Sequence, residues 1–264
     1  MSLMILSFAI CNVPTMPLRR EPAHRSEQVS QILFGEKVEV LEINDKEWAR
    51  IRCEWDNYEG WCKSSQIKFL HAKEYKKEIK FLNSTHSDKL IMEQGEMLLA
   101  LGSSMFGMKG KKVPVNGKVG IFKGKKLSTK NMEASGVLLQ AVAMQYLHAP
   151  YLWGGRSIQG IDCSGLTQMA YKLCGKRLPR DAWQQAMEGE TVDFLQSAQC
   201  GDLAFFDNEE GKIIHVGMLL SNQTIIHATD TSGRVVVDLI DQGGIISHSL
   251  RKRTHQLRMI KRYL

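Results

Sequence analysis

Cys163 stands at the start of a pattern that predicts a helix. From Ser164 onward, apolar residues recur at helical spacing until Gly175. Backbone N–H groups at a helix N-terminus favour negative charge, so we expect this thiol to ionise more easily than a free thiol, whose pKa is about 8.5. A thiolate beside a base is a nucleophile, which makes Cys163 a candidate for covalent catalysis.

Two downstream histidines are candidates for the base and for a residue that orients it. His215 opens one predicted strand and His227 closes the next. A turn centred on Ser221 would place them directly opposite each other, whereas a two-residue turn at Asn222 and Gln223 would throw them out of register. Residue types alone leave open a buried cysteine and two hydrogen-bonded sheet histidines. No acidic fourth ligand lies nearby, so we expect no metal and no other cofactor.

The composition is that of a globular protein with a basic surface. The 264 residues are 43% hydrophobic and 24% charged, enough to bury a core in one large domain or several small ones. Much of the net charge of +7 lies in a lysine-rich stretch between residues 109 and 130 and at the C-terminus. An anionic partner is one interpretation, but solvated loops and strand edges are favoured. The lysine stretch lacks interleaved aromatic residues, so we expect no nucleic-acid partner.

Neither a disulfide framework nor a membrane span is expected. The six cysteines have no compact spacing and no Cys-x-x-Cys pair, so the five other than Cys163 are interpreted as small buried residues. No apolar run reaches the roughly 18 residues of a membrane span. The apolar stretch from Leu3 to Val13 lacks the features of a signal peptide and is predicted to form a strand. We expect a cytoplasmic location, with a periplasmic or secreted one as the alternative if a signal peptide has been removed.

The pattern of elements divides the chain into three parts. Residues 1–70 contain short strands separated by turn signals, which is typical of a small all-β barrel. Residues 71–130 are predicted to form a second, divergent barrel, with a β-rich linker as the alternative. Residues 131–264 begin with helices, at 132–146, after Cys163 and at 181–187, and continue with strands, which is an α+β pattern.

Five ordered motifs in the third part resemble the NlpC-type cysteine peptidases. They are Tyr151–Gly155, Gly160–Leu166, Gly201–Phe206, His215–Gly217 and Ile226–Ala228. That family has a papain-like α+β core and a Cys-His-polar triad, and it cleaves peptidoglycan peptides between γ-D-glutamate and a diamino acid. The resemblance implies that Cys163 is the nucleophile, His215 the base and His227 the orienting residue.

The whole chain resembles the cell-wall recycling subgroup, in which SH3-like barrels precede the peptidase. The stretches Phe34–Val40, Trp48–Ile51 and Tyr58–Cys62 are similar to a bacterial SH3-like domain. The resemblance implies release of L-Ala-γ-D-Glu from free murein tri- or tetrapeptides whose N-terminal L-alanine is unblocked, and we expect a monomer. The alternatives are a non-catalytic wall-binding protein and an amidase or acyltransferase on the same core.

The resemblance also implies substrate contacts within the peptidase part. Asp162 and Ser164, which flank the nucleophile, would hold the N-terminal end of the peptide. Tyr151 would line the site near the scissile carbonyl. Asp181 would join the amine-binding pocket, although Ala182 stands where family members often carry serine.

Two further contacts are implied from the first SH3-like domain. Tyr58 matches the position of a pocket tyrosine, and Glu27 is a candidate carboxylate for the alanine ammonium. A carboxylate that faces a free amine would discriminate against an intact cell-wall stem, in which the same nitrogen is an uncharged amide.

Overall fold

The structure, a computed structural model, describes residues 5–264. The chain divides into two compact units between Met132 and Glu133, and each unit is considered by itself. Leu3, where the first apolar stretch begins, lies outside the described residues, and the strand there is formed by Ser7–Cys11. Within residues 5–264, no helix has both the length and the apolar character needed to cross a membrane.

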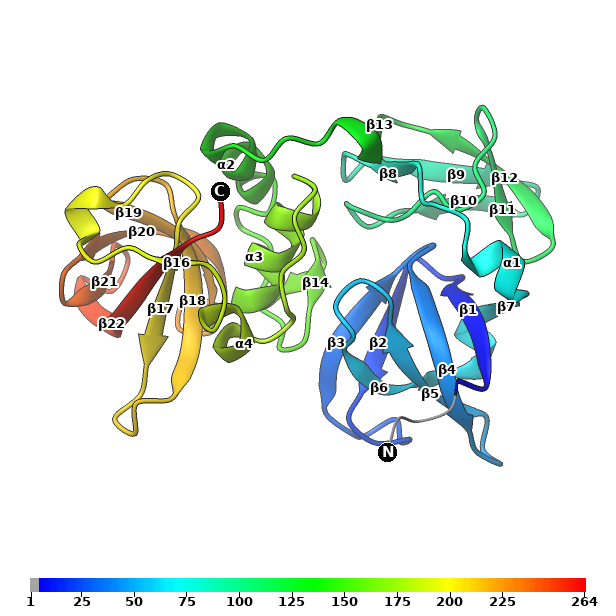
Figure 1. Ribbon diagram of the computed structural model, residues 1–264, viewed down its shortest axis with the longest axis horizontal. Coiled ribbons are helices and arrows are strands. Elements are labelled where there is room, and N and C mark those ends of the chain that lie inside the picture. Colours follow the sequence, from blue (N-terminus) through cyan, green and yellow to red (C-terminus); the bar gives the residue numbers. More distant parts are fainter. Residues whose placement is uncertain (1–4) are drawn as a thin grey trace. The chain divides into compact units, whose positions relative to one another are not determined.

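The first unit opens with an antiparallel sheet of seven strands in the order β3-β2-β6-β5-β4-β1-β7. Alternate residues along the strands, such as Met16 and Leu18 or Val38 and Val40, are buried, so one face of each strand lines a common core. Figure 1 shows how the sheet curls around that core. The strands are β1 (Ser7–Cys11), β2 (Thr15–Arg19), β3 (Gln28–Leu33), β4 (Lys37–Ile43), β5 (Trp48–Cys53), β6 (Glu59–Lys63) and β7 (Ile67–Leu70).

The rest of the first unit forms its own sheet, in the order β10-β9-β12-β11, beside a pair made by β8 and β13. Its apolar cluster is built around Leu90, Leu99 and Phe122, and Phe34 from the first sheet joins this cluster. A second barrel with the limits 71–130 therefore stays a prediction. The elements are α1 (Ala72–Tyr75), β8 (Phe81–Asn83), β9 (Lys89–Met92), β10 (Gly95–Leu98), β11 (Lys112–Val115), β12 (Lys118–Lys123) and β13 (Lys126–Ser128).

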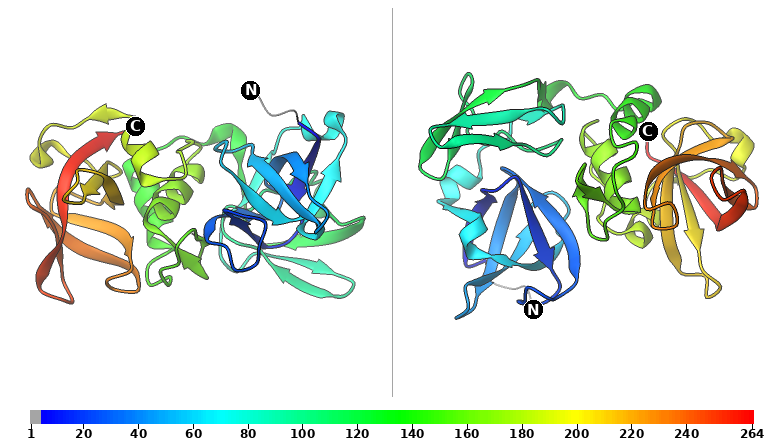
Figure 2. Two further views of the ribbon diagram at one scale, coloured as in Figure 1. Left: turned by 90° about the horizontal axis from the view of Figure 1, so that it is seen from below. Right: turned by 180° about the vertical axis from the view of Figure 1, so that it is seen from behind.

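The second unit combines helices with a closed barrel. Strands β17 to β20 form an antiparallel meander, and β22 pairs with both β17 and β21, so six strands close on themselves. Helix α3 packs against β18 and β19, and Figures 1 and 2 show the helices gathered on one side of the barrel. The elements are α2 (Gly136–Met144), β14 (Arg156–Ser157), β15 (Gly160–Ile161), α3 (Cys163–Lys172), α4 (Ala182–Ala186), β16 (Glu190–Thr191), β17 (Leu203–Asp207), β18 (Ile213–Leu219), β19 (Thr224–Thr229), β20 (Arg234–Asp241), β21 (Gly244–Ser247) and β22 (Lys252–Arg262).

Capping residues set the helix boundaries in this unit. Helix α3 begins at Cys163, as the apolar spacing predicts. The helix predicted over 132–146 is shorter, because the hydroxyl of Ser135 accepts a backbone N–H of the first turn and α2 starts only after it. The helix predicted over 181–187 is α4, with Asp181 as its N-cap.

Candidate active site

The start of α3 places Cys163 on a tightly packed backbone. Asp162 is the N-cap, and its Oδ1 accepts the N–H of Gly165 at 2.7 Å. A Cβ atom at position 165 would lie 2.2 Å from the carbonyl oxygen of Gly155. Only glycine therefore allows the loop before the helix to pass this close. The backbone N–H of Cys163 lies in the first turn of α3 and so has no acceptor within the helix. It points toward the N-terminal end of the helix, where the thiol also lies.

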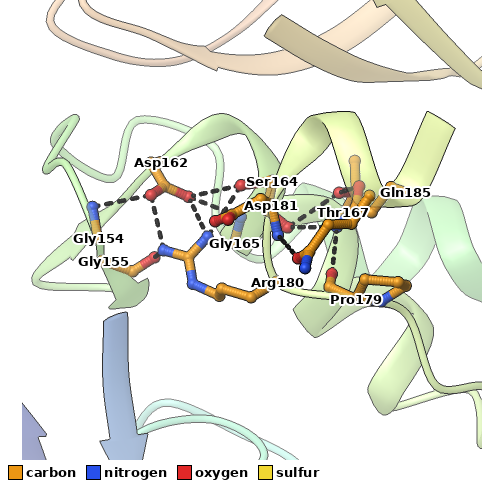
Figure 3. Close-up of polar contacts among 11 residues, drawn as sticks. Gly154, Gly155, Asp162, Ser164, Gly165, Thr167, Pro179, Arg180, Asp181 and Gln185 are labelled. Atoms are coloured by element: carbon orange, nitrogen blue, oxygen red, sulfur yellow. Dashed lines mark hydrogen bonds and ion pairs between the residues drawn. The ribbon is translucent and has the colours of Figure 1, made fainter. Parts of the chain in front are cut away.

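A buried ion pair anchors this helix start. The guanidinium of Arg180 reaches Asp162 through Nη2–Oδ2 at 2.6 Å and Nη1–Oδ1 at 3.0 Å, and it donates to the Ser164 hydroxyl at 2.9 Å (Figure 3). Gly154 N–H donates to the second Asp162 oxygen at 2.8 Å. Arg180 is 1% exposed and Asp162 6%. A substrate ammonium would have to share these carboxylate oxygens with Arg180.

The two histidines meet diagonally across the hairpin. Strands β18 and β19 pair Met218 with Ile226 and Leu219 with Ile225, so His227 lies opposite Gly217, two residues from His215. Neither of the two turns considered from the sequence is the one formed. The diagonal pair still meets: His215 Nε2 and His227 Nδ1 are 2.9 Å apart. A Cβ at Gly217 would lie 2.6 Å from Cδ1 of Ile225 and 3.0 Å from Cβ of His227, so the missing side chain leaves room for both residues.

Behind the histidine pair lies a carboxylate that the sequence did not suggest. His227 Nε2 is 3.2 Å from Oδ2 of Asp238 on β20, and Asp238 Oδ1 accepts the backbone N–H of His248 at 2.8 Å. His255 on β22 stacks on His215, with ring centroids 4.1 Å apart. Two signals were available in the sequence. One is an aspartate among the valines at 235–237, since aspartate is depleted in strands, and the other is a histidine close to the apolar residues Leu257 and Ile260.

The thiol does not have the lowered pKa expected of a helix N-terminus. Burial raises the pKa of Cys163 to about 12, and the charge of Asp162 adds to this effect. A backbone hydrogen bond with Val216, the positive charge of Arg180 and a backbone hydrogen bond with Ser164 act in the opposite direction but are outweighed. The expectation of an easily ionised thiol is therefore wrong for the resting protein. The bond with Val216 also places the sulfur beside the residue that follows His215.

The proposed base is neutral as well. Burial lowers the pKa of His215 well below 6.5, and the neighbouring His227 and His255 lower it further. The thiol of Cys163 and the imidazole of His215 are thus both neutral in the resting protein. Such a pair acts by general base catalysis, in which the proton moves to the imidazole as the sulfur attacks.

The three histidines do not form a good metal site. Nitrogen atoms of His215, His227 and His255 lie within 4.8 Å of one another. Two nitrogens bound to one zinc ion at about 2.1 Å can be at most about 4.2 Å apart. The rings of His215 and His255 are stacked at an interplanar angle of 23°, so their in-plane lone pairs do not converge on one point. We assign no metal to this cluster.

The other predicted contacts in the second unit lie near the helix start. Tyr151 forms a bridge with Ile161, directly before Asp162. Burial raises the pKa of its phenol, and the nearby Cys163 and Asp162 raise it further. Asp181 caps α4 in a reciprocal pair with Gln184, next to Arg180 (Figure 3). Arg180 is a further residue that sequence reasoning missed, because nothing local signals a partner 18 residues away.

The remaining two predicted contacts belong to the first unit. Tyr58 packs against the core of the seven-stranded sheet. Glu27 forms an ion pair with Arg20 at 2.8 Å, with both side chains partly exposed. Their contribution to a substrate pocket stays a prediction.

The cysteines behave largely as expected from their spacing. All six, each within the described part of the chain, are free thiols. Cys11, Cys53, Cys62 and Cys174 are buried as predicted, whereas Cys200 is only half-buried.

Comparison with known proteins identifies both parts of the chain. Residues 148–254 match the model of the NlpC/P60 family, and residues 18–67 match a model described as a bacterial dipeptidyl-peptidase Sh3 domain. The chain is 30% identical over 239 residues to the gamma-D-glutamyl-L-lysine dipeptidyl-peptidase of Bacillus subtilis (strain 168), covering 79% of this chain and 74% of that relative. It is 29% identical over 252 residues to dipeptidyl-peptidase 6 of Lysinibacillus sphaericus, covering 85% and 89%.

A solved structure supports the fold. The crystal structure of an NlpC/P60 family protein from Bacillus cereus ATCC 10987 aligns with a TM-score of 0.83 at 20% identity, covering 98% of this chain and all of that one. The expected fold class, an α+β papain-like core preceded by SH3-like β-structure, is thereby confirmed, while the second of the two expected SH3-like barrels stays a prediction. By family match and overall similarity, the chain belongs to the NlpC/P60 family and is a cysteine peptidase.

Proposed function

We propose that the protein hydrolyses the bond between γ-D-glutamate and the diamino acid of free murein peptides, releasing L-Ala-γ-D-Glu. The observation that carries this proposal is the 30% identity to a gamma-D-glutamyl-L-lysine dipeptidyl-peptidase over 79% of the chain, more than the peptidase unit alone. The match of residues 18–67 to a dipeptidyl-peptidase Sh3 domain points to the same reaction.

The arrangement of Cys163 and His215 accounts for the chemistry. As Sγ attacks the scissile carbonyl carbon, His215 takes the thiol proton, and the backbone N–H of Cys163 stabilises the oxyanion. His215 then gives the proton to the leaving amine as the C–N bond breaks and a thioester remains. Water, deprotonated by His215, releases the acyl group and restores the thiol. His227 orients His215 through their 2.9 Å hydrogen bond.

Specificity for a free N-terminus requires negative charge near the alanine ammonium. Asp162 is already balanced by Arg180, whose guanidinium it meets at 2.6 Å. A second carboxylate is therefore needed. We assign this role to Glu27, because its ion pair with Arg20 is partly exposed and so is exchanged for another cation at less cost than the buried pair of Asp162. Asp181 is a further contributor. Ser164, Tyr151 and Tyr58 complete the pocket that we propose.

Product analysis tests the reaction. The protein is incubated with L-Ala-γ-D-Glu-meso-diaminopimelate and, separately, with the L-lysine peptide, and the products are identified by mass spectrometry. We expect L-Ala-γ-D-Glu from at least one of them. The variant Cys163→Ala should release none, while Cys200→Ala, which removes a half-buried thiol 37 positions away in sequence, should match the wild type. Cleavage by Cys163→Ala, or none by the wild type, contradicts the proposal.

A blocked substrate tests the amine pocket separately. Acetylation of the alanine nitrogen removes its charge and should reduce kcat/KM by about 100-fold, because a charge-assisted hydrogen bond contributes roughly 1.5–3 kcal/mol. Equal cleavage of the blocked and free peptides would exclude the roles assigned to Glu27 and Asp181. It would not contradict the catalytic roles of the cysteine and the two histidines.

A further inference from the structure

Three polar side chains form a continuous path across the interior of the barrel. His215, His227 and Asp238 come from the neighbouring strands β18, β19 and β20, and each is at most 6% exposed. Cross-strand pairing places His215 opposite Phe206 and Asp238 opposite Ile225, two residues of the barrel's apolar core. Buried polar groups in such surroundings are held in place by their hydrogen bonds, because burying a polar group without a hydrogen-bond partner lowers the stability of the fold.

The direction of each hydrogen bond follows from the carboxylate. Burial raises the pKa of Asp238, but hydrogen bonds from the His227 ring and the His248 N–H outweigh it and hold the pKa below its usual value. The group is thus an acceptor only, and His227 Nε2 must carry the hydrogen of the 3.2 Å contact. In a neutral His227, Nδ1 is then bare and accepts the hydrogen of His215 Nε2.

We propose that Asp238 is a positioning residue that fixes the tautomers of His227 and His215, leaving Nδ1 of His215 bare to receive the thiol proton. His215 Nε2 is occupied by His227, so Nδ1 is the only ring atom left for Cys163. This inference rests on the role proposed for His215 as base. When the proton passes from Sγ to Nδ1, His215 becomes an imidazolium whose charge faces Asp238 through His227, and the carboxylate takes up no proton.

With the opposite set of tautomers, His215 could not accept the thiol proton. If Nδ1 of His227 carried the hydrogen, His215 Nε2 would have to accept it, and Nδ1 of a neutral His215 would be protonated. Of the other titratable groups, His255 from β22 packs against both rings, and Cys163 lies at the start of α3 beside Val216. Neither is hydrogen-bonded to His227 within the described contacts, so Asp238 is the group that selects its tautomer.

The substitution Asp238→Asn should reverse the tautomers of His227 and His215, and the reason is geometric. The His248 N–H holds Oδ1 of the side chain at 2.8 Å and requires an acceptor there. The amide oxygen introduced by Asp238→Asn therefore takes this place, and its NH2 group faces His227 Nε2. His227 must accept at Nε2, donate from Nδ1, and leave His215 protonated at Nδ1.

Kinetics of this variant give the first test. We expect kcat to fall about 10⁴-fold with KM changed less than threefold, as in an enzyme where a carboxylate-to-amide change imposes the wrong histidine tautomer. Alkylation of Cys163 by iodoacetamide, which needs no peptide substrate, should slow by a similar factor. The matched control is Asp241→Asn, an exposed carboxylate on the same strand paired with Arg253, which should change neither rate more than twofold.

Nitrogen NMR of the histidine rings gives the second test. In the ¹⁵N-labelled wild type, we expect His215 and His227 to carry their hydrogens on Nε2, and in Asp238→Asn on Nδ1. A wild-type spectrum with Nδ1–H on either ring overturns the proposal, even if the variant does not fold. Alkylation and kcat within threefold of the wild type in a folded Asp238→Asn variant also overturn it. Because alkylation and NMR do not depend on the peptide, failure of the proposed substrate is distinguished from failure of this inference.

Discussion

Asp162 and Asp238 are both buried carboxylates of the second unit, and each accepts a backbone N–H, yet their side-chain partners differ in kind. Asp162 faces the guanidinium of Arg180, a group that keeps its proton at any pH the protein meets. Asp238 faces the imidazole of His227, which can hold its proton on either nitrogen.

Because of this difference, we expect Asp162 and Asp238 to have different tasks. An ion pair with a permanent cation fixes the position of a helix start but cannot respond to proton transfer. A carboxylate on a neutral imidazole has no counter-ion and depends on its hydrogen bonds, and it controls on which nitrogen of its partner a proton resides. We therefore expect changes at Asp162 to appear mainly in stability and changes at Asp238 mainly in rate.

The largest effect on stability is expected from Asp162→Asn. The substitution leaves the Arg180 charge buried without its counter-ion, which should lower the free energy of unfolding by about 3–5 kcal/mol. Urea unfolding followed by circular dichroism measures this loss. A decrease below about 1 kcal/mol would show that solvent reaches the guanidinium and that the anchoring role is wrong.

Removing both partners should restore much of that loss. In the double variant Asp162→Leu, Arg180→Met, no charge is left unpaired, and only the N-cap and neighbouring hydrogen bonds are missing. We expect the free energy of unfolding to lie within about 2 kcal/mol of the wild type. If the double variant is less stable than Asp162→Asn, the hydrogen bonds of the network outweigh its charge balance.

Asp238→Asn should affect stability less. The amide keeps two hydrogen bonds, and no permanent charge is left behind, so we expect a loss of about 1 kcal/mol in the same urea experiment. Comparing this value with that of Asp162→Asn tests the contrast directly. Equal losses would mean that both carboxylates act as structural anchors.

The smallest effect concerns acid pH and His255. Burial lowers the pKa of His255 to about 4 from 6.5, with His227 lowering it further and Asp230 and Asp238 opposing this. The folded protein thus binds fewer protons than the unfolded chain in this window. Its stability is complete above pH 6.5 and decreases as the pH falls toward about 4.

The variant His255→Asn removes one of the groups responsible. Its urea midpoint should decrease less between pH 7 and pH 5 than that of the wild type. The difference should correspond to at most about one proton taken up on unfolding. Both proteins still contain His215, whose pKa is lowered in the same direction, so some dependence persists. Identical slopes for the two proteins would contradict the burial of His255 in its neutral form.

Local patterns predicted the elements around the site but not the contacts between them. The helix after Cys163 and the strands that carry His215 and His227 follow from periodicity, which is a property of neighbouring residues. The diagonal meeting of the histidines depends on one residue in the turn, and the partnership of Arg180 with Asp162 depends on how two segments pack. The raised pKa of Cys163 has the same origin, because tertiary packing and not the helix alone buries the sulfur.

The diagonal path from His215 to Asp238 has a consequence for the connecting loops. Each step moves two residues along the next strand, so the path depends on the count of residues between strands: 221–223 in one hairpin and 230–233 in the other. Inserting a single residue in either loop would turn the following strand's side chains to the opposite face. These loops are therefore restricted in length, and the gaps that separate distant relatives should fall elsewhere.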